Sequence, residues 1–168
     1  LPFTHVADEM GRIAARNALR RGRARCFDAA AIPWVTFTDP EVARIGLSER
    51  DASGVGGARV AYLPMTEVDR AIVSDQTQGF VKLIAGRRRL LGNLGGGRIL
   101  GATVVAPRAG EMIHEAALAM RTGMFAGRIA QTVHAYPTWS VAMRVAAAQF
   151  VTDVRGRSAR PVSRDRDE

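Results

Sequence analysis

The N-terminal part of the chain has the period of a helix. Over residues 6–19, apolar side chains recur every three or four positions and arginines occupy the other side. Thr4 is a suitable N-cap, Asp8 and Glu9 suit the first turn, and Gly22 is a stop signal. This pattern predicts an amphipathic helix that ends before Gly22.

The middle of the chain has the alternation and the turn residues of β-strands. A β-branched and aromatic run over residues 34–38 is followed by an Asp-Pro turn and a second apolar stretch that ends at Leu47. Ser48 then fits the N-cap of a short helix. Three further strands are expected in "ARVAYLPM", "GFVKLIAGRR" and "ILGATVVA", and the last two form a hairpin with a loose, glycine-rich connection.

Helical patterns return after Pro107. The stretches "AGEMIHEAALAMRTG", "AGRIAQ" and "SVAMRVAAAQFVTDV" predict three helices, and residues 155–168 are polar, charged and expected to be disordered. The chain is therefore expected to be an α+β domain, with a mostly antiparallel sheet of about five strands flanked by helices.

Three features of the composition exclude classes of site. Cys26 is the single cysteine, so the chain holds no internal disulfide and no dithiol redox centre. His5, His114 and His134 are far apart and lack the spacing of metal ligands, so no metal site is expected. The three glycines at 95–97 lack a following Gly-Lys-Ser/Thr, which favours a flexible turn over a phosphate loop.

The chain is strongly basic. Its net charge is +8, and Lys82 is its only lysine. Arginines cluster over residues 12–25 and in the tail, but no aromatic residues alternate with them as a stacking platform for bases requires. We therefore do not expect nucleic acid as a partner.

No membrane partner is expected from the hydropathy pattern either. No run approaches the roughly eighteen apolar residues of a membrane span, and the first ten residues lack the features of a secretion signal. The sequence predicts a cytoplasmic protein.

Four motifs together resemble the C-terminal dimerisation domain of the flavin disulfide reductases, or pyridine nucleotide-disulfide oxidoreductases. They are "IPWVTFTDPEVARIGLSERDA", "VDRAIVSDQTQGFVKLI", "RILGATVVAPRAGEMIHEAALAMRTGM" and "HAYPTWS". This family includes dihydrolipoamide dehydrogenase, glutathione reductase and mercuric reductase. The order and spacing of the four motifs make the resemblance specific over residues 4–154.

The resemblance implies a fragment of a larger enzyme. Residues 1–24 would be a remnant helix of an FAD-binding domain with its linker, residues 25–154 the dimerisation domain, and residues 155–168 a basic tail. The parent would use FAD and NAD(P)H and form a homodimer, whereas the chain alone would bind neither cofactor and be inactive. The missing FAD and NAD(P)H domains would be its partners.

Two places in the chain match functional positions of the family. Thr4, His5 and Val6 fall where N–H groups at a helix start approach the flavin, an arrangement that stabilises negative charge. Tyr136 takes the place of a catalytic His before Pro-Thr that reaches the other subunit's active site. The resemblance implies a cis bond to Pro137, with the backbone at Pro137 facing the partner's flavin.

The orienting glutamate expected five residues later is replaced by Val141. Tyr136 is a poor base at neutral pH, but it can donate a hydrogen bond or approach a metal ion. An ordinary turn tyrosine is the alternative. Glu111, His114 and Glu115 lie on a helix that packs at the twofold interface in the family, and His114 is expected to be an interface or core residue.

Several functions remain open at this level. Mercuric reductases resemble the chain most, since they too carry a Tyr at this position, but their terminal Cys pair is missing here. A dihydrolipoamide dehydrogenase-like fragment is one alternative, and a free-standing basic module that binds nucleic acid is another. The electron acceptor and the choice between NADH and NADPH are not determined by the sequence.

Overall fold

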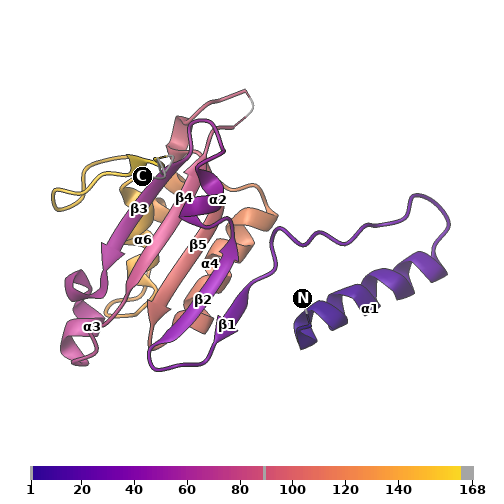
Figure 1. The fold of residues 1–168 in the computed structure, drawn as a ribbon, viewed down its shortest axis with the longest axis horizontal. Coiled ribbons are helices and arrows are strands. Elements are labelled where there is room, and N and C mark those ends of the chain that lie inside the picture. The colour runs from indigo at the N-terminus through magenta and orange to yellow at the C-terminus, as the bar shows by residue number, and fades with distance from the viewer. Residues whose placement is uncertain (1, 89, 164–168) are drawn as a thin grey trace, which may run out of the picture.

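A six-stranded antiparallel sheet forms the centre of the molecule in a computed structural model that describes residues 2–88 and 90–163 (Figure 1). The strands follow the order β1-β2-β5-β4-β3-β6. Their bounds are β1 Trp34–Thr36, β2 Glu41–Gly46, β3 Arg59–Pro64, β4 Phe80–Gly86, β5 Arg98–Ala106 and β6 Arg160–Pro161.

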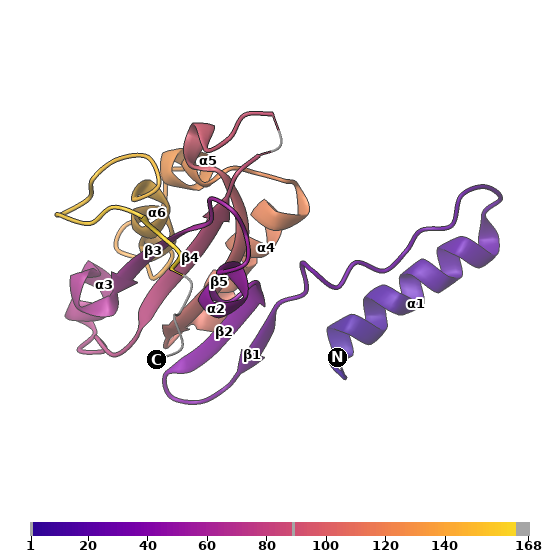
Figure 2. The same cartoon turned by 45° about the horizontal axis from the view of Figure 1, so that its top comes forward.

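The helices lie mostly on one side of this sheet. They are α1 Thr4–Leu19, α2 Glu49–Ala52, α3 Asp69–Val73, α4 Ala109–Arg121, α5 Ala126–Gln131 and α6 Val141–Ala148, with 3-10 turns η1 Met65–Glu67 and η2 Leu94–Gly96. Helices α4, α5 and α6 cover one face, whereas α1 stands apart from the sheet on a long connection (Figures 1 and 2).

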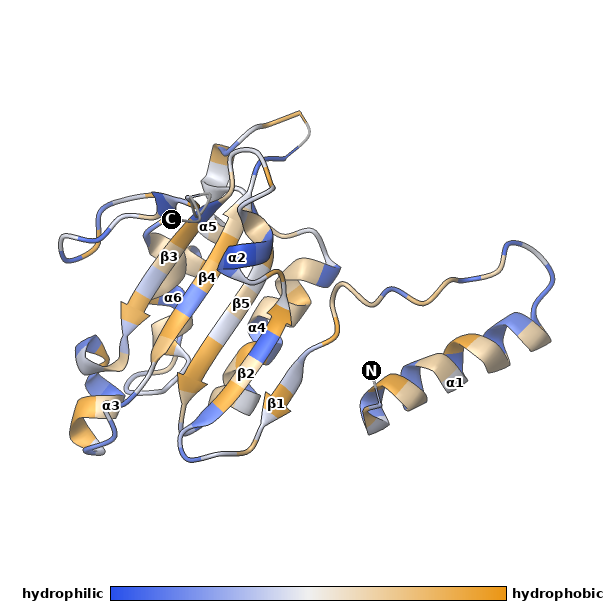
Figure 3. Cartoon of the chain, in the orientation of Figure 1, coloured by the Kyte–Doolittle hydropathy of each residue, from blue (hydrophilic) through white to orange (hydrophobic). Residues whose placement is uncertain are grey.

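The period-two pattern of the strands explains which face is covered. Ala43, Val104, Val81 and Leu63 lie side by side across four strands and are buried beneath the helices. Their neighbours along the strands point to the open face, so hydrophilic and hydrophobic positions alternate along β2 in Figure 3. Burial of one face fixes the register of the sheet.

Most predicted elements are confirmed. The β4–β5 hairpin pairs antiparallel, and α4 and α5 lie where the pattern placed them. Ser48 caps α2 in a capping box: its hydroxyl accepts from the Asp51 N–H, while the Asp51 carboxylate accepts from the Ser48 N–H. The residues at 95–97 form a turn in which all three glycines have positive φ, a backbone that other residues rarely adopt.

The expectation of a disordered tail from residue 155 is wrong for its first part. Arg160–Pro161 pairs with β3 as a sixth strand, one more than the five expected. The Arg157 guanidinium donates two hydrogen bonds to Glu67 Oε1, at 3.0 and 2.6 Å. These contacts satisfy the edge of β3 and hold the segment in place. Residues 164–168 lie outside the described part of the chain.

Three element boundaries also differ from prediction. Thr4 is the first residue of α1 rather than its cap, because Phe3 occupies the N-cap position without a side-chain bond. The first strand stops at Thr36 and the turn beyond it contains a cis Asp39-Pro40 bond. Helix α6 ends at Ala148, and the buried Gln149 side chain bonds both backbone groups of Tyr62 on β3.

Candidate functional site

The segment between α5 and α6 carries the residues singled out in "HAYPTWS". Its Tyr136-Pro137 bond is cis, as the resemblance implies. The Thr138 hydroxyl donates to the Ala135 carbonyl at 2.6 Å and closes the turn around this bond. The segment over residues 132–140 thus has a defined shape. Its polar contacts join its beginning to α4 and α5, and Tyr136 to α3.

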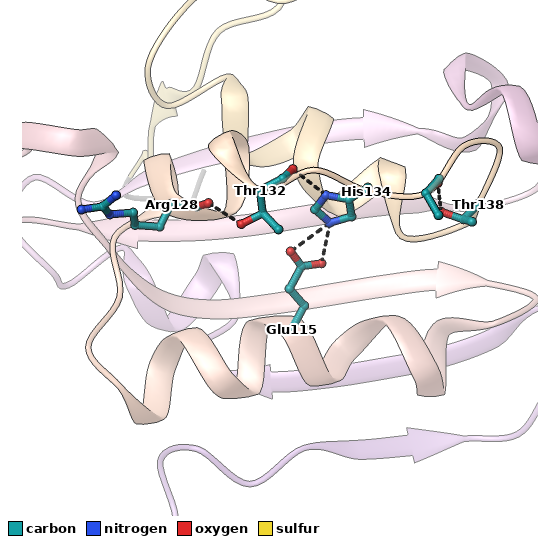
Figure 4. Close-up of polar contacts among 6 residues, drawn as sticks. Glu115, Arg128, Thr132, His134 and Thr138 are labelled. Atoms are coloured by element: carbon teal, nitrogen blue, oxygen red, sulfur yellow. Dashed lines mark hydrogen bonds and ion pairs between the residues drawn. The ribbon is translucent and has the colours of Figure 1, made fainter.

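His134 holds the beginning of this segment to helix α4 (Figure 4). Its Nε2 lies 3.0 and 3.2 Å from the two carboxylate oxygens of Glu115, and its Nδ1 lies 2.9 Å from the Thr132 carbonyl oxygen. The His134 side chain is only 7% exposed. Both ring nitrogens face acceptors, so a doubly protonated ring donates to both, whereas a neutral ring donates to one.

Thr132 continues this connection into helix α5. Its hydroxyl donates to the Arg128 carbonyl at 2.8 Å, one turn back, where α5 ends (Figure 4). A hydroxyl that bonds a terminal carbonyl satisfies one of the acceptors left free at a helix end. Helices α4 and α5 therefore both fix the start of the segment.

Tyr136, two residues further, points away from the core. The residue as a whole is 72% exposed, and its hydroxyl donates to Asp69 Oδ2 at 3.0 Å. This hydrogen bond, together with the negative charge of Asp69, raises the pKa of Tyr136 above its usual value. The phenol therefore directs its proton to Asp69, while most of the residue is exposed to solvent.

Asp69 is the first residue of α3, a short helix that follows β3 and η1. A carboxylate in the first turn of a helix is favoured by the unpaired N–H groups there. The next residue, Arg70, lines a hollow of about 330 Å³ with Trp139, which follows the turn. Asp39, Glu41 and Arg108 also line this hollow, so charges of both signs meet beside the turn.

The other predicted positions, at the start of α1, lie on the part of the chain that stands apart from the sheet. The Val6 N–H donates to the Phe3 carbonyl at 3.1 Å. Within the described residues, the N–H groups of Thr4 and His5 have no hydrogen-bond acceptor. His5 Nε2 lies 2.8 Å from the Pro33 carbonyl oxygen, which ties this helix start to the linker before β1.

Three further side chains that the sequence singled out are not part of this arrangement. Val141 is the first residue of α6. Glu111 and His114 are exposed on α4, and no side-chain hydrogen bond involves either of them in the described structure. His114 was expected at an interface or in the core. Its exposure excludes the core, and a place at a subunit interface stays a prediction.

Sequence reasoning missed two participants, Glu115 as the partner of His134 and Asp69 as the partner of Tyr136. Each pair joins distant parts of the chain, 19 and 67 residues apart. No local pattern signals such pairs. Only the placement of α4 and α3 against the segment reveals them.

Comparisons with known proteins agree on the family of this domain and show that it matches one part of longer proteins. The family model for the pyridine nucleotide-disulphide oxidoreductase dimerisation domain matches residues 32–147. A mercuric reductase of Streptomyces lividans is 39% identical over 153 residues, and a dihydrolipoyl dehydrogenase of Haloferax volcanii is 35% identical over 146 residues. These alignments cover 90% and 86% of the chain, but only 31% and 29% of the two relatives.

Solved structures give the same result. The crystal structure of LpdA from Mycobacterium tuberculosis superimposes with a TM-score of 0.79 at 34% identity, over 90% of this chain and 32% of LpdA. The α+β fold with its antiparallel sheet is therefore shared. The chain spans about a third of the length of the proteins it matches.

Proposed function

The chain belongs to the pyridine nucleotide-disulphide oxidoreductase dimerisation-domain family, and we propose that it serves an NAD(P)H-dependent flavin disulfide oxidoreductase of the mercuric reductase-like kind. Residues 25–154 would form the twofold interface, and the turn at Tyr136 and Pro137 would enter the partner subunit's active site. The observation that carries this proposal is the exposed Tyr136 beside the buried His134.

The surface of α4 supports the assignment of an interface. Its inner side, including Met112 and Ile113, is buried against the sheet. On its outer side Leu118 is exposed, and Val133 is exposed in the segment that His134 ties to this helix. Apolar side chains on two neighbouring elements suit an isologous contact with a second copy. We expect the purified chain to form a homodimer with twice the monomer mass in light scattering.

In the active site, Tyr136 would present a neutral phenol whose O–H group already donates a hydrogen bond to Asp69. Its oxygen then has a lone pair free for an incoming group. Such an oxygen can accept a hydrogen bond from a thiol or approach a metal ion. This role differs from that of a general base, because the proton remains on Tyr136 throughout.

The start of α1 fits a flavin in one respect. The N–H groups of Thr4 and His5 have no acceptor among the described residues, and free N–H groups at a helix start favour negative charge. FAD, when bound, would pass electrons from NAD(P)H to the acceptor. This chain would contribute the N–H groups of Thr4 and His5 to one subunit's cofactor and the Pro137 backbone to that of its partner. Val6 would only shape the helix start, because its N–H already bonds the Phe3 carbonyl.

A hybrid dimer tests whether Tyr136 acts in the partner's site. In a longer protein that carries this chain with FAD and NAD(P)H domains, one subunit would have Tyr136→Phe and the other an inactivated redox Cys pair. If the turn acts across the interface, one active site retains all its groups, and the hybrid keeps about half of the normal activity. Activity far below half would place Tyr136 in its own subunit's active site. A side chain outside the chemistry would also leave about half of the activity, and the homodimer variant identifies that case.

The homodimer of Tyr136→Phe provides the second measurement. We expect turnover to fall about tenfold or more while flavin content and dimer mass stay unchanged. Tyr62→Phe, at a tyrosine on β3 whose side chain makes no hydrogen bond to the turn in the described structure, is the matched control and should keep full activity. A Tyr136→Phe enzyme as active as the parent would refute the role.

A dihydrolipoyl dehydrogenase-like activity remains the second candidate, since relatives of that name are 35% and 37% identical to the chain. The position of Tyr136, without a His or a glutamate five residues later, disfavours it. Oxidation of NADPH measured with mercuric ion and with lipoamide as acceptors would separate the two. The cytoplasmic location and the domain boundaries stay predictions.

A further inference from the structure

The tip of the β4–β5 hairpin, residues 87–97, exposes apolar side chains to solvent. Leu90 is 92% exposed, Leu94 is 69% exposed, and Leu91 is about half exposed. Backbone hydrogen bonds between Arg88 and Gly92, at 2.7 and 3.0 Å, close a tight turn with Leu90 and Leu91 at its apex. Isolated exposed leucines are common, but three within five residues on one tip are not.

Arginines surround these leucines. Arg87 and Arg88 precede them, Arg98 follows them, and Arg128 comes from α5. The sequence contains no acidic residue between Asp75 and Glu111. None of these four guanidinium groups pairs with a carboxylate in the described structure. The tip therefore combines apolar side chains with uncompensated positive charge.

Two of the arginines are held in place by an aromatic ring. The guanidinium carbons of Arg88 and Arg128 each lie 5.2 Å from the centre of the Phe125 ring. Together with Gln131 they line a hollow of about 690 Å³. Phe125 in turn packs over Gly95, where a Cβ would lie only 2.7 Å from the ring. The charges are thus attached to the folded domain rather than to a loose loop.

The tip lies at the opposite end of the sheet from α3, whose Asp69 bonds Tyr136 (Figures 1 and 2). Contact of the tip with another surface would therefore leave the proposed active-site turn free. No helix within the described residues is long and apolar enough to cross a bilayer. A loop that inserts only into the interfacial layer has no such requirement.

We propose that the hairpin tip docks on an anionic lipid surface, with Leu90, Leu91 and Leu94 among the headgroups and acyl chains. The neighbouring arginines would bind lipid phosphates, since basic clusters beside apolar residues are attracted to anionic membranes. Nucleic acid explains the arginines but not the leucines. Phe125 is half-buried beneath two guanidinium groups, so its ring is not available for stacking on bases. This proposal revises the expectation that the chain has no membrane partner.

Vesicle co-sedimentation of the purified chain tests the proposal. We expect binding to vesicles that contain phosphatidylglycerol, weak binding to pure phosphatidylcholine, and a loss of binding as salt screens the charges. Arg88→Gln with Arg128→Gln should weaken binding about thirtyfold, given the attraction of each arginine to an anionic surface. Leu90→Ser with Leu94→Ser should weaken it at least tenfold, because the polar side chains lose the transfer into the apolar layer.

Matched controls lie at the other end of the sheet. Arg70→Gln with Arg108→Gln removes the same charge, and Ile72→Ser with Val73→Ser removes exposed apolar side chains of α3. Both control pairs should bind vesicles as the parent does. Circular dichroism checks that all variants are folded. The proposal is overturned if the parent fails to bind phosphatidylglycerol vesicles at low salt, or if a control pair loses as much binding as the matching tip pair.

Nucleic acid is measured in the same series. Binding to duplex DNA that depends on Arg88 and Arg128, without vesicle binding that depends on Leu90 and Leu94, would also overturn the proposal. It would instead support a nucleic-acid-binding surface.

Discussion

His134 and Tyr136 lie two residues apart, yet their side chains have opposite surroundings. His134 is 7% exposed and bonds Glu115 of α4, whereas Tyr136 is 72% exposed and bonds only Asp69 at the surface. A buried polar group contributes to stability through bonds that water cannot replace. An exposed one contributes little to stability and is available for contacts with other molecules. His134 therefore fixes the turn to helix α4, whereas Tyr136 is exposed by the turn for contact with another molecule.

Loss of the buried contact should have the largest effect on stability. His134→Ala removes the hydrogen bonds to Glu115 and to the Thr132 carbonyl and leaves a space beside α4. We expect the free energy of unfolding to fall by about 2 kcal/mol. Urea denaturation followed by circular dichroism measures this. Stability equal to that of the parent would show that the contact with α4 does not hold the turn.

A milder change at the same contact should cost less. Glu115→Gln keeps an acceptor for His134 but removes the negative charge, and we expect a loss of about 1 kcal/mol. Glu111→Gln, on the exposed side of the same helix, removes the same charge and should cost only about 0.3 kcal/mol, which comes from its place in the first turn of α4. Equal losses for the two variants would mean that stability depends on the negative charge of α4 and not on the hydrogen bond between Glu115 and His134.

The fold was predictable where local pattern determines it, as in the β4–β5 hairpin and the Ser48 capping box. It was not predictable where distant segments meet. Arg160–Pro161 has the polar composition of a disordered tail, and it becomes a strand only because β3 offers a free edge. The candidate site follows the same rule. Tyr136 was identified from its motif, but its partner Asp69 is brought to it by tertiary packing.

Removal of the exposed hydroxyl should hardly change stability. Tyr136→Phe keeps the ring and loses one surface hydrogen bond to Asp69, so we expect the free energy of unfolding to stay close to that of the parent. Thermal unfolding of this variant beside His134→Ala gives a direct comparison. A loss of stability as large as that of His134→Ala would contradict the interpretation that Tyr136 is exposed for binding and does not fix the turn.

The smallest effect concerns the ionisation of Tyr136. Its pKa is raised by the hydrogen bond to Asp69 and by the charge of that carboxylate. A group with a raised pKa in the folded state adds stability below its unfolded value, about 10. That contribution is lost as the pH rises through the folded value. Because both side chains are at the surface, the contribution itself should be small.

The pKa can be measured from the ultraviolet absorbance of the phenolate in a Tyr62→Phe background, where Tyr136 is the only tyrosine left. We expect a midpoint above that of free tyrosine, and Asp69→Asn should lower it toward 10 by removing the charge. Asp75→Asn, which removes an aspartate that does not contact Tyr136, is the control and should leave the midpoint in place. If Asp69→Asn has no effect on the midpoint, the phenol is not held by Asp69 in solution. Tyr136 would then reach a partner's active site without the fixed orientation that makes its oxygen available.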